Sequence, residues 1–419
     1  MTAPLSESTK QLLGELSAKS PKKIDLTRAD HADLVYEITA SLIANVTDPS
    51  ELAEIESFLV AQEEQGTIAL RLALMLAMSK LWVGTISEPL RLSVVFAVYK
   101  EHNRIRTQAE HPHGEDFLRK KVAQLDWLFE ATPKVSWELI IVDDGCPENS
   151  GGIAREIIEE NHLEEKARVL FLSEAIAQGL DPVKSLDDTG QSQKGGSIVY
   201  GMWDAVQRSK EGSHIVVYTD ADLSTHLGQV GMLIKPILES GKKVAIGSRR
   251  EPKSVVIKKA GRNNRGKLFI YLWKQMIPVL GSIIDTQCGF KAFDTKVVAK
   301  IIPDMIETKF AFDIELLLRA AMIDENSIEK VAIAWIDSEA ASTTTDIQPY
   351  LPMLKSIGKM YARYMQPSAR SDEFAAFVED LSDAGFSELL EQIPQEIVQR
   401  EPVEFNEYKG INASDLYQA

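Results

Sequence analysis

The sequence predicts an α/β fold, with a mostly parallel sheet in the middle of the chain and helical segments at both ends. Short apolar runs rich in β-branched residues alternate with helical segments between Leu92 and Arg249, and this alternation is typical of parallel strands joined by crossover helices. Apolar residues recur at helical spacing before residue 90 and after residue 366. We therefore expect an N-terminal helical extension (1–90), an α/β domain (91–345) and an acidic helical C-terminal tail (346–419).

The bulk properties of the chain exclude several classes of function. It has 419 residues and a formal net charge of −16, and an acidic surface repels polyanions, so we expect no binding to nucleic acid. Cys146 and Cys288 form no CxxC motif, which favours a reducing, cytoplasmic location over a disulfide framework or a zinc site. The first residues lack the apolar run of a secretory signal. The apolar stretch at 68–83 contains two basic residues and is shorter than the ~20 residues of a membrane span, so we predict a buried helix there.

Both ends of the chain are predicted to be helical units without catalytic spacing. Asp48-Pro49 favours a helix stop and restart, with proline in the first turn of the second helix. We expect the N-terminal helices to form a docking or dimerisation unit, which leaves a homo-oligomer open. The tail is acidic and amphipathic, and a helix packed on its own domain is favoured over a partner-binding helix. Its apolar stripe consists of Phe374, Phe377, Val378 and Leu381.

The elements of the α/β domain follow one another in a regular order. The predicted strands are LSVVFAV (92–98), WELIIVDDG (137–145), RVLFLS (168–173), HIVVYTDADLS (214–224) and KVAIGSR (243–249), and the predicted helices are 117–129, 153–160 and 195–209. Ligands of such sheets bind beyond the carboxyl ends of the strands. Two acidic clusters fall at those ends.

The acidic clusters are candidates for binding a metal or a nucleotide. Asp143 and Asp144 could accept hydrogen bonds from a base or a ribose, although Asp-Gly is also a common turn pair. In a strand, Asp220 and Asp222 would point to the same side. Two such carboxylates suit Mg²⁺ or Mn²⁺ completed by substrate phosphates, and the alternative is a strand-end turn with solvated acids.

Glycine and basic residues suggest a phosphate-bearing ligand. Lys194 and Gly195 open a predicted helix, whose N-terminal N–H groups could attract an anion. The alternative is a glycine-rich loop without a ligand. Arg249, Arg262 and Arg265 form a local basic run in an acidic protein, for which a phosphate is the natural counterpart.

Two further segments carry polar residues in an aromatic setting. DTQCGFKAF (285–293) has neither helical nor strand periodicity and is predicted to be a loop that contributes to a site. FAFDIELL (310–317) is the entry to a helix, where helix capping is the favoured explanation of Asp313 taken by itself.

The order and spacing of these motifs resemble glycosyltransferase family 2, and most of all its dolichyl-phosphate glucosyltransferase-like branch. The resemblance covers about 92–364, well over half of the chain. IIVDDG is similar to the family's uridine-binding strand, KGGSIVYGM to its glycine helix start and TDADLS to its metal motif. DTQCGFKAF with AFDIELL is the most specific pair, and VAIAWIDSEAAS is similar to the strand that follows.

The resemblance implies a GT-A fold and a role for each matching residue. Asp143 and Asp144 would bind the base and ribose, Asp220 the ribose or sugar, and Asp222 a Mn²⁺ or Mg²⁺ ion at the diphosphate, with Asp220 beside it. Asp313 would be the base or orient the acceptor, with Gln287 and Glu315 close by. The other residues that would contact donor or acceptor are Tyr99, Glu101, Lys194, Gly195, Arg249, Arg262, Arg265 and Lys291.

The chain departs from the family pattern at several places, one of which is the missing asparagine before the Lys-Gly-Gly element at 194–196. Ala97 and Lys100 replace the proline and asparagine of the first loop. The insert from His102 to Phe117 is foreign to the pattern, and its two histidines, His111 and His113, are either solvated or a metal site. Membrane-bound members carry hydrophobic anchors, and no such segment is recognised here.

The expected function is inverting transfer of a sugar, with glucose favoured, from a nucleoside-diphosphate sugar, with UDP favoured. The acceptor is either a polyprenyl phosphate, reached by peripheral contact with a membrane, or a hydroxyl compound. A sugar-phosphate nucleotidyltransferase is disfavoured because FAVYKEHNRI has no glycine after the first strand. A non-catalytic nucleotide-sugar-binding protein remains the alternative from another class.

Overall fold

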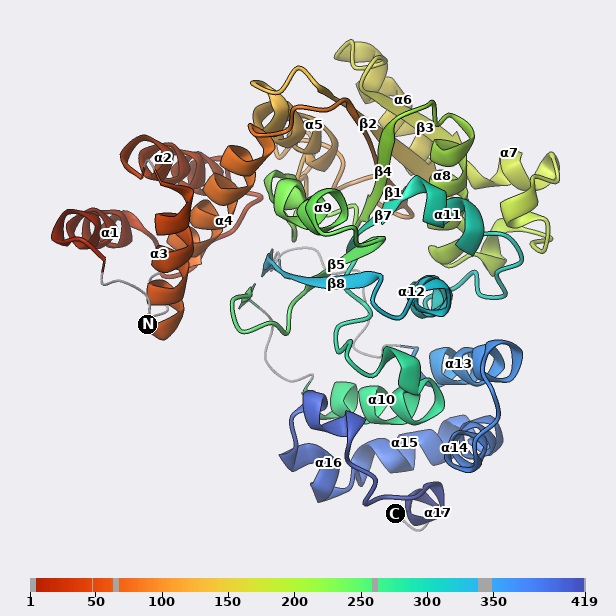
Figure 1. Ribbon diagram of the computed structural model, residues 1–419. Coiled ribbons are helices and arrows are strands. Elements are labelled where there is room, and N and C mark those ends of the chain that lie inside the picture. Colours follow the sequence, from red (N-terminus) through yellow and green to blue (C-terminus); the bar gives the residue numbers. More distant parts are fainter. Residues whose placement is uncertain (1–4, 47, 63–67, 258–262, 338–348, 418–419) are drawn as a thin grey trace.

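A seven-stranded sheet forms the centre of the computed structural model, which describes residues 5–46, 48–62, 68–257, 263–337 and 349–417 (Figure 1). The strand order is β3-β2-β1-β4-β7-β5-β8, and β6 and β9 form a separate parallel pair. The strands are β1 Leu90–Val98, β2 Val135–Asp143, β3 Ala167–Phe171, β4 Ser213–Thr219, β5 Val244–Ser248, β6 Val255–Ile257, β7 Phe290–Asp294, β8 Ile328–Ala332 and β9 Ala334–Ile336. The predicted α/β architecture with a mostly parallel sheet is confirmed in this topology.

One strand of the sheet was predicted to be a loop. β7 lies between β4 and β5 and runs antiparallel to both, with Lys291 opposite Tyr218 and Ile246. The prediction was wrong there because Lys291 breaks the apolar pattern, although its side chain is wholly buried beside Phe290 and Phe293. Every other pairing in the sheet is parallel.

Helices cover both faces of the sheet. Along β1, Val94 and Phe96 belong to the apolar core on one face and Val95 to the core on the other, as the period of two in a strand requires. The first face packs against α5 Phe117–Phe129, α6 Ser150–Glu160 and α9 Val230–Glu239. The second packs against α8 Gly195–Gln207, α11 Thr295–Ile301 and α12 Phe312–Ile323, and its apolar core extends to α7 Leu172–Ala177 and α10 Asn263–Met276.

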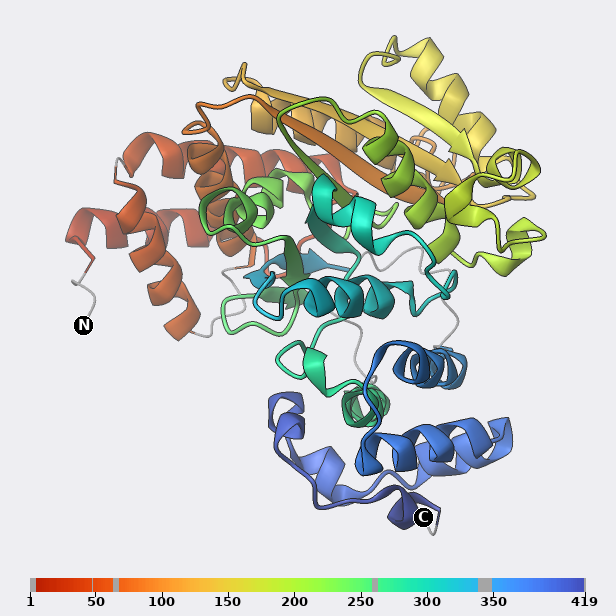
Figure 2. The ribbon, with the colours of Figure 1, turned by 45° about the vertical axis from the view of Figure 1, so that its right-hand side comes forward.

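Four N-terminal helices lie beside the first face, drawn red to orange in Figures 1 and 2. They are α1 Glu7–Lys19, α2 Ala29–Asn45, α3 Pro49–Ala61 and α4 Ile68–Val83. α4 is buried on nearly all sides and packs against α9 and α5. The apolar stretch at 68–83 is therefore an interior helix, as predicted. Within the described ranges, no helix is long and apolar enough to cross a membrane.

The C-terminal helices pack on α10 and away from the N-terminal ones (Figure 1). They are α13 Tyr350–Tyr364, α14 Ala369–Asp380, α15 Asp383–Glu391, α16 Gln395–Gln399 and α17 Ala413–Leu416. Phe374 and Phe377 are buried there, and the buried ammonium of Lys267 donates to the Val398 carbonyl at 2.9 Å. The acidic tail thus packs on its own chain, as its apolar stripe indicated.

Candidate active site

The loops that follow β1, β2, β4 and β5 lie at the carboxyl edge of the sheet, and of the predicted site residues they carry Tyr99, Glu101, Asp144, Asp220, Asp222 and Arg249. β4 ends at Thr219, so Asp220 and Asp222 are loop residues. Strand geometry therefore does not place their side chains on one side, contrary to the prediction. Asp220 pairs with Lys194, whereas Asp222 faces Arg104, although the charges of both aspartates act on Lys121 and Lys194.

The first acidic cluster is engaged by the chain itself. Asp143 accepts from the N–H groups of Cys146 at 2.9 Å and Gly151 at 2.7 Å, which ties the end of β2 to the start of α6. Asp144 accepts at 2.6 Å from the hydroxyls of Ser192 and Ser197, and its other oxygen accepts from the Lys194 N–H at 2.7 Å. Burial raises the pKa of Asp144 above its usual value, against the lowering by these donors. Asp144 therefore shapes the loop before α8.

Lys194 occupies a backbone conformation that few residues with side chains adopt. Its φ is 83°, a strain of order 1–3 kcal/mol that is typical of functional sites. Two hydrogen bonds stabilise this conformation. The Lys194 N–H donates to Asp144, and the Lys194 ammonium donates to Asp220 Oδ1 at 2.5 Å. The strained backbone thereby fixes one cation directly beside the second acidic cluster.

Gly195 is needed for close packing. A Cβ atom there would lie 2.5 Å from the Lys309 carbonyl oxygen and 2.6 Å from that of Thr308. The N–H of Gly196 donates to the same Thr308 carbonyl at 2.8 Å. The start of α8 is thus bound to the chain just before α12. This contact explains why glycines stand here, where the sequence suggested an anion at the helix start.

Asp220 lies between Gly289 and the cationic side chains of the site. Its N–H donates to the Gly289 carbonyl at 3.1 Å, and a Cβ on Gly289 would lie 2.3 Å from its Oδ1. The glycine of DTQCGFKAF is therefore required by the Asp220 side chain. Burial acts to raise the pKa of Asp220, but the charges of Lys194, Arg249 and Lys121 outweigh it and lower that pKa. The Asp220 carboxylate is ionised at neutral pH.

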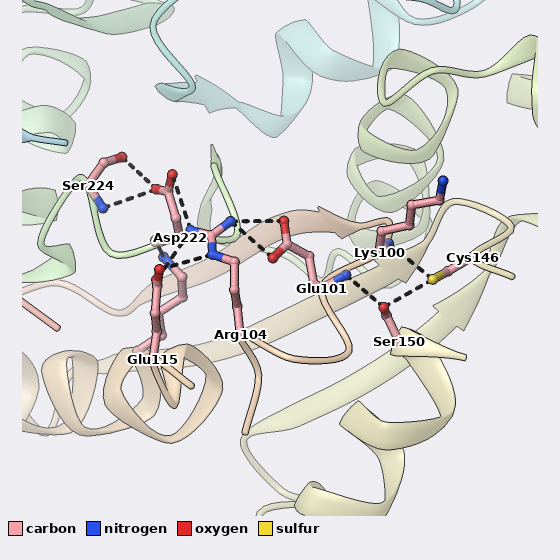
Figure 3. Close-up of polar contacts among 9 residues, drawn as sticks. Lys100, Glu101, Arg104, Glu115, Cys146, Ser150, Asp222 and Ser224 are labelled. Atoms are coloured by element: carbon pink, nitrogen blue, oxygen red, sulfur yellow. Dashed lines mark hydrogen bonds and ion pairs between the residues drawn. The ribbon is translucent and has the colours of Figure 1, made fainter. Parts of the chain in front are cut away.

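Asp222 is partly exposed, and the chain holds it on three sides (Figure 3). Its Oδ1 accepts from the Ser224 N–H at 3.0 Å and hydroxyl at 2.6 Å. Its Oδ2 lies 3.7 Å from Arg104 Nη2, and its carbonyl accepts from the buried ammonium of Lys121 at 2.8 Å. The carboxylate oxygens of Asp222 are hard ligands of the kind that Mg²⁺ and Mn²⁺ prefer. No cluster of three or more acids, histidines or cysteines suited to a metal occurs in the described part of the chain, so substrate oxygens would have to complete such a site.

The insert after β1 contributes a buried ionic network that the sequence did not predict. The guanidinium of Arg104 bonds both oxygens of Glu101, at 3.0 and 3.1 Å, and both of Glu115, at 3.0 and 3.2 Å (Figure 3). Burial raises the pKa of Glu101 to about 7. The carboxyl group of Glu101 faces Arg104, which in turn lies beside Asp222. Tyr99 is 49% exposed at the start of this loop.

The insert also contains His111 and His113, for which the sequence allows either solvated side chains or a metal site. The rings of His111 and His113 lie 5.6 Å apart in a solvent-facing stretch. The N–H of His113 donates to His111 Nδ1 at 3.1 Å, so this ring nitrogen is engaged by the chain itself. The solvated alternative fits these contacts.

Arg249 is held by an acidic residue of the DTQCGFKAF segment. Its Nε and Nη2 donate to the two oxygens of Asp285 at 2.8 and 2.7 Å, and its N–H donates to Asp285 at 2.7 Å. The guanidinium lies 5.3 Å from the ring of Trp335. Burial acts to raise the pKa of Asp285, but Arg249 outweighs it and lowers that pKa to about 2. Arg249 is thus a fixed cation beside Asp220.

We expect Asp285→Asn to destabilise the protein in a pH-dependent way. The pKa of Asp285 falls from 3.8 to about 2 on folding, so the ionised carboxylate contributes about 2 kcal/mol of stability at neutral pH. That contribution is present above about pH 4 and is lost as the pH falls toward 2. Urea unfolding at pH 7 and pH 3 should give a deficit that shrinks at the lower pH. A deficit that is equal at both values would contradict this account of Asp285.

Lys291 and Asp313 form a buried pair beneath the site. Lys291 Nζ donates to Asp313 Oδ1 at 2.8 Å and to the Cys288 carbonyl at 2.5 Å. Burial raises the pKa of Asp313 and lowers that of Lys291 to about 7. Ala311 is the N-cap of α12, so the explanation of Asp313 as a helix cap is wrong. Whether charged or neutral, Asp313 is bonded to Lys291.

Four other residues named from the sequence lie in different settings. Gln287 follows Thr286 in the same loop, and its buried Nε2 has no hydrogen-bond partner among the described residues. Glu315 accepts from the N–H groups of Ile306 and Glu307 and from Tyr364, so it supports the loop before α12. Arg265 lines a cavity with Leu390 and other residues of the C-terminal helices. Arg262 lies outside the described residues.

Arg104 and Lys121 are the site residues that sequence reasoning missed. Both are buried, and both contact Asp222. A signal existed for Lys121, which interrupts the apolar stripe of the predicted helix 117–129. A cation on a buried helical face needs a partner, and the nearest acidic motif was the aspartate pair. No comparable signal marked Arg104.

Comparisons with known proteins agree with the motifs. No family model matches the chain. The dolichyl-phosphate beta-glucosyltransferase of Drosophila melanogaster is 27% identical over 286 residues, covering 67% of this chain and 77% of the relative. The human protein of the same name is 25% identical over 290 residues, covering 68% and 78%. These similarities relate the chain to glycosyltransferases and confirm the resemblance to family 2 that its motifs indicate.

Solved structures give a weaker likeness. Mannosyl-3-phosphoglycerate synthase from Rubrobacter xylanophilus has a TM-score of 0.45 and 15% identity, covering 68% of this chain and 76% of the synthase. Glucosyl-3-phosphoglycerate synthase from M. tuberculosis has a TM-score of 0.44 and 16% identity, covering 70% and 86%.

Proposed function

We propose that this chain is an inverting glycosyltransferase that moves glucose from UDP-glucose to a polyprenyl phosphate. The observation that carries the proposal is the pair Asp220 and Asp222 at the carboxyl edge of the sheet, with Lys194 and Arg249 fixed beside Asp220. The similarity to dolichyl-phosphate beta-glucosyltransferases supports the donor sugar and the class of acceptor. Because such lipids reside in membranes, we also propose that the protein is cytoplasmic and works at a membrane surface.

The donor's diphosphate would lie beside these charges. Asp222, with Asp220, would hold a Mn²⁺ or Mg²⁺ ion, which when bound neutralises the charge of the departing diphosphate. Lys194 and Arg249 are the protein's own cations for the same leaving group. Their positions are fixed before the donor arrives, by the strained backbone of Lys194 and by the two-point bond of Arg249 to Asp285. Fixed charges need little rearrangement as the leaving group departs.

The proposed reaction is one displacement. An oxygen of the acceptor phosphate forms a bond to the anomeric carbon, while the bond from that carbon to the diphosphate oxygen breaks and its electron pair leaves with UDP. A phosphate monoester, with a second pKa near ~6, is largely ionised at neutral pH and needs no general base. The buried bond between Asp313 and Lys291 favours this acceptor, because a carboxyl oxygen that already accepts from Lys291 is less available to take a proton from a hydroxyl acceptor.

Calorimetric titration with nucleoside diphosphates tests the donor assignment. In the presence of Mn²⁺ we expect UDP to bind at least about ten times more tightly than GDP or ADP, a difference of ~1.4 kcal/mol. Removing the divalent cation with a chelator should weaken UDP binding, because the diphosphate then meets Asp220 and Asp222 without their counter-ion. Tighter binding of GDP than of UDP would overturn the donor assignment.

A further inference from the structure

The loop that carries Asp222 is hydrogen-bonded to β9 at two points. After Asp222 it passes through Ser224, whose carbonyl accepts from the Ile336 N–H at 2.8 Å, and reaches His226 and the short turn Leu227–Gln229. The side chain of Gln229 donates to the Ala334 carbonyl at 3.0 Å and accepts from the Ala334 N–H at 2.7 Å. β9 therefore holds one side of the loop.

The other side of the loop lies against one face of α5. Three residues of that helix, spaced by three, contact successive parts of the loop. Lys121 donates to the Asp222 carbonyl at 2.8 Å, and Gln124 accepts from the Leu227 N–H at 2.9 Å. The ring of Trp127 meets that of His226 edge to face, with centroids 6.5 Å apart. α5 thus sets the position of the loop from Asp222 to His226.

The N-terminal helices reach the same loop directly. His226 Nδ1 accepts from the Gly228 N–H at 2.9 Å, so the proton lies on Nε2, which is 3.1 Å from the hydroxyl of Tyr36 on α2. The ring of Tyr36 also packs on Trp127 with centroids 5.1 Å apart. A Cβ on Gly228 would lie 2.8 Å from Leu76 of α4. Two N-terminal helices therefore close the space behind the loop.

We propose that the N-terminal helices fix the conformation of the Asp222 loop through Tyr36, and that Tyr36 is thereby a positioning residue for the cation and diphosphate. This inference rests on the proposed function, because it assumes that Asp222 binds the ion. Tyr36 does not contact the donor. It acts through His226, four residues after Asp222, and through Trp127 on the helix that also carries Lys121.

Tyr36→Phe tests this role while keeping the packing of the ring. The matched control is Trp82→Phe. Trp82 Nε1 donates to Glu239 at 2.6 Å, so this substitution also removes one hydrogen bond between the N-terminal helices and α9, but away from the loop. One lost hydrogen bond should weaken the affinity of Mn²⁺ with UDP about 3- to 10-fold in Tyr36→Phe. Trp82→Phe should keep the affinity of the unchanged protein. Hydrogen exchange without ligand should quicken at the Leu227 and Gly228 amides in Tyr36→Phe alone.

The two readouts separate failure of this inference from failure of the proposed function. Unchanged exchange and unchanged affinity in Tyr36→Phe would overturn the positioning role, and so would an equal loss of affinity in the Trp82→Phe control. A different result would be faster exchange in Tyr36→Phe together with no binding of Mn²⁺ and UDP by the protein without substitutions. That result would overturn the proposed function and with it the role of Tyr36 toward the ion.

Discussion

Asp222→Ala should reduce glucosyl transfer by at least about 100-fold while leaving the protein folded. The substitution removes the partly exposed carboxylate that would bind the ion. It leaves the Lys121 bond intact, because that bond is made to the Asp222 carbonyl. The loss of the bonds from Ser224 to Asp222 should lower stability by only about 1 kcal/mol.

The control for this variant lies beyond the other end of the same strand. Glu211 is exposed just before the amino end of β4, whereas Asp222 follows its carboxyl end. Glu211→Ala should keep full activity, and both variants should melt within a few degrees of the unchanged protein. Full activity of Asp222→Ala, or full activity of the unchanged protein in excess chelator, would remove the ion from the account.

Arg249→Lys should lower the rate of transfer by about 100-fold, because lysine cannot reproduce the two-point bond to Asp285 that fixes the cation. Arg250→Lys is the matched control, since this neighbouring arginine is exposed, and its activity should be unchanged. Asp313→Asn should lose only a few-fold in rate, because an amide oxygen can still accept from Lys291.

The same variants distinguish the two classes of acceptor. A hydroxyl acceptor is protonated at pH 7 and would gain roughly 100-fold or more from a carboxylate base. With such an acceptor Asp313→Asn would lose more activity than Arg249→Lys, and the acidic limb of the pH–rate profile would flatten. That result would replace polyprenyl phosphate by a hydroxyl compound in the proposed reaction.

Periodic patterns in the sequence predicted most of the fold. The helix expected at 117–129 has these bounds in the structure, and β1, β2, β4 and β5 fall within or beside the predicted apolar runs. These elements are buried on regular faces, so composition and spacing report them directly. β7 was missed for the opposite reason, since its second residue, Lys291, has a polar side chain whose burial only the tertiary contacts with Asp313 and the Cys288 carbonyl make tolerable.

The candidate site was only partly predictable, because its contacts join residues far apart in the sequence. The motifs placed Lys194, Asp220 and Arg249 in one region, and the structure brings them together. Nothing in the sequence indicated which charged side chains of the site would pair with one another. Arg104 reaches Asp222 from the insert, and Arg265, which looked like part of the basic run, turns toward the C-terminal helices.

Product analysis after incubation with UDP-glucose, Mn²⁺ and a polyprenyl phosphate in detergent tests the central claim most directly. UDP-glucose is α-linked, so a single displacement predicts a lipid-linked β-glucosyl phosphate, seen in the proton coupling at the anomeric carbon, with one UDP released for each product. Addition of chelator should stop its formation. An α-linked product, glucosylation of hydroxyl acceptors with no lipid product, or tight binding of UDP-glucose without any turnover would contradict the claim.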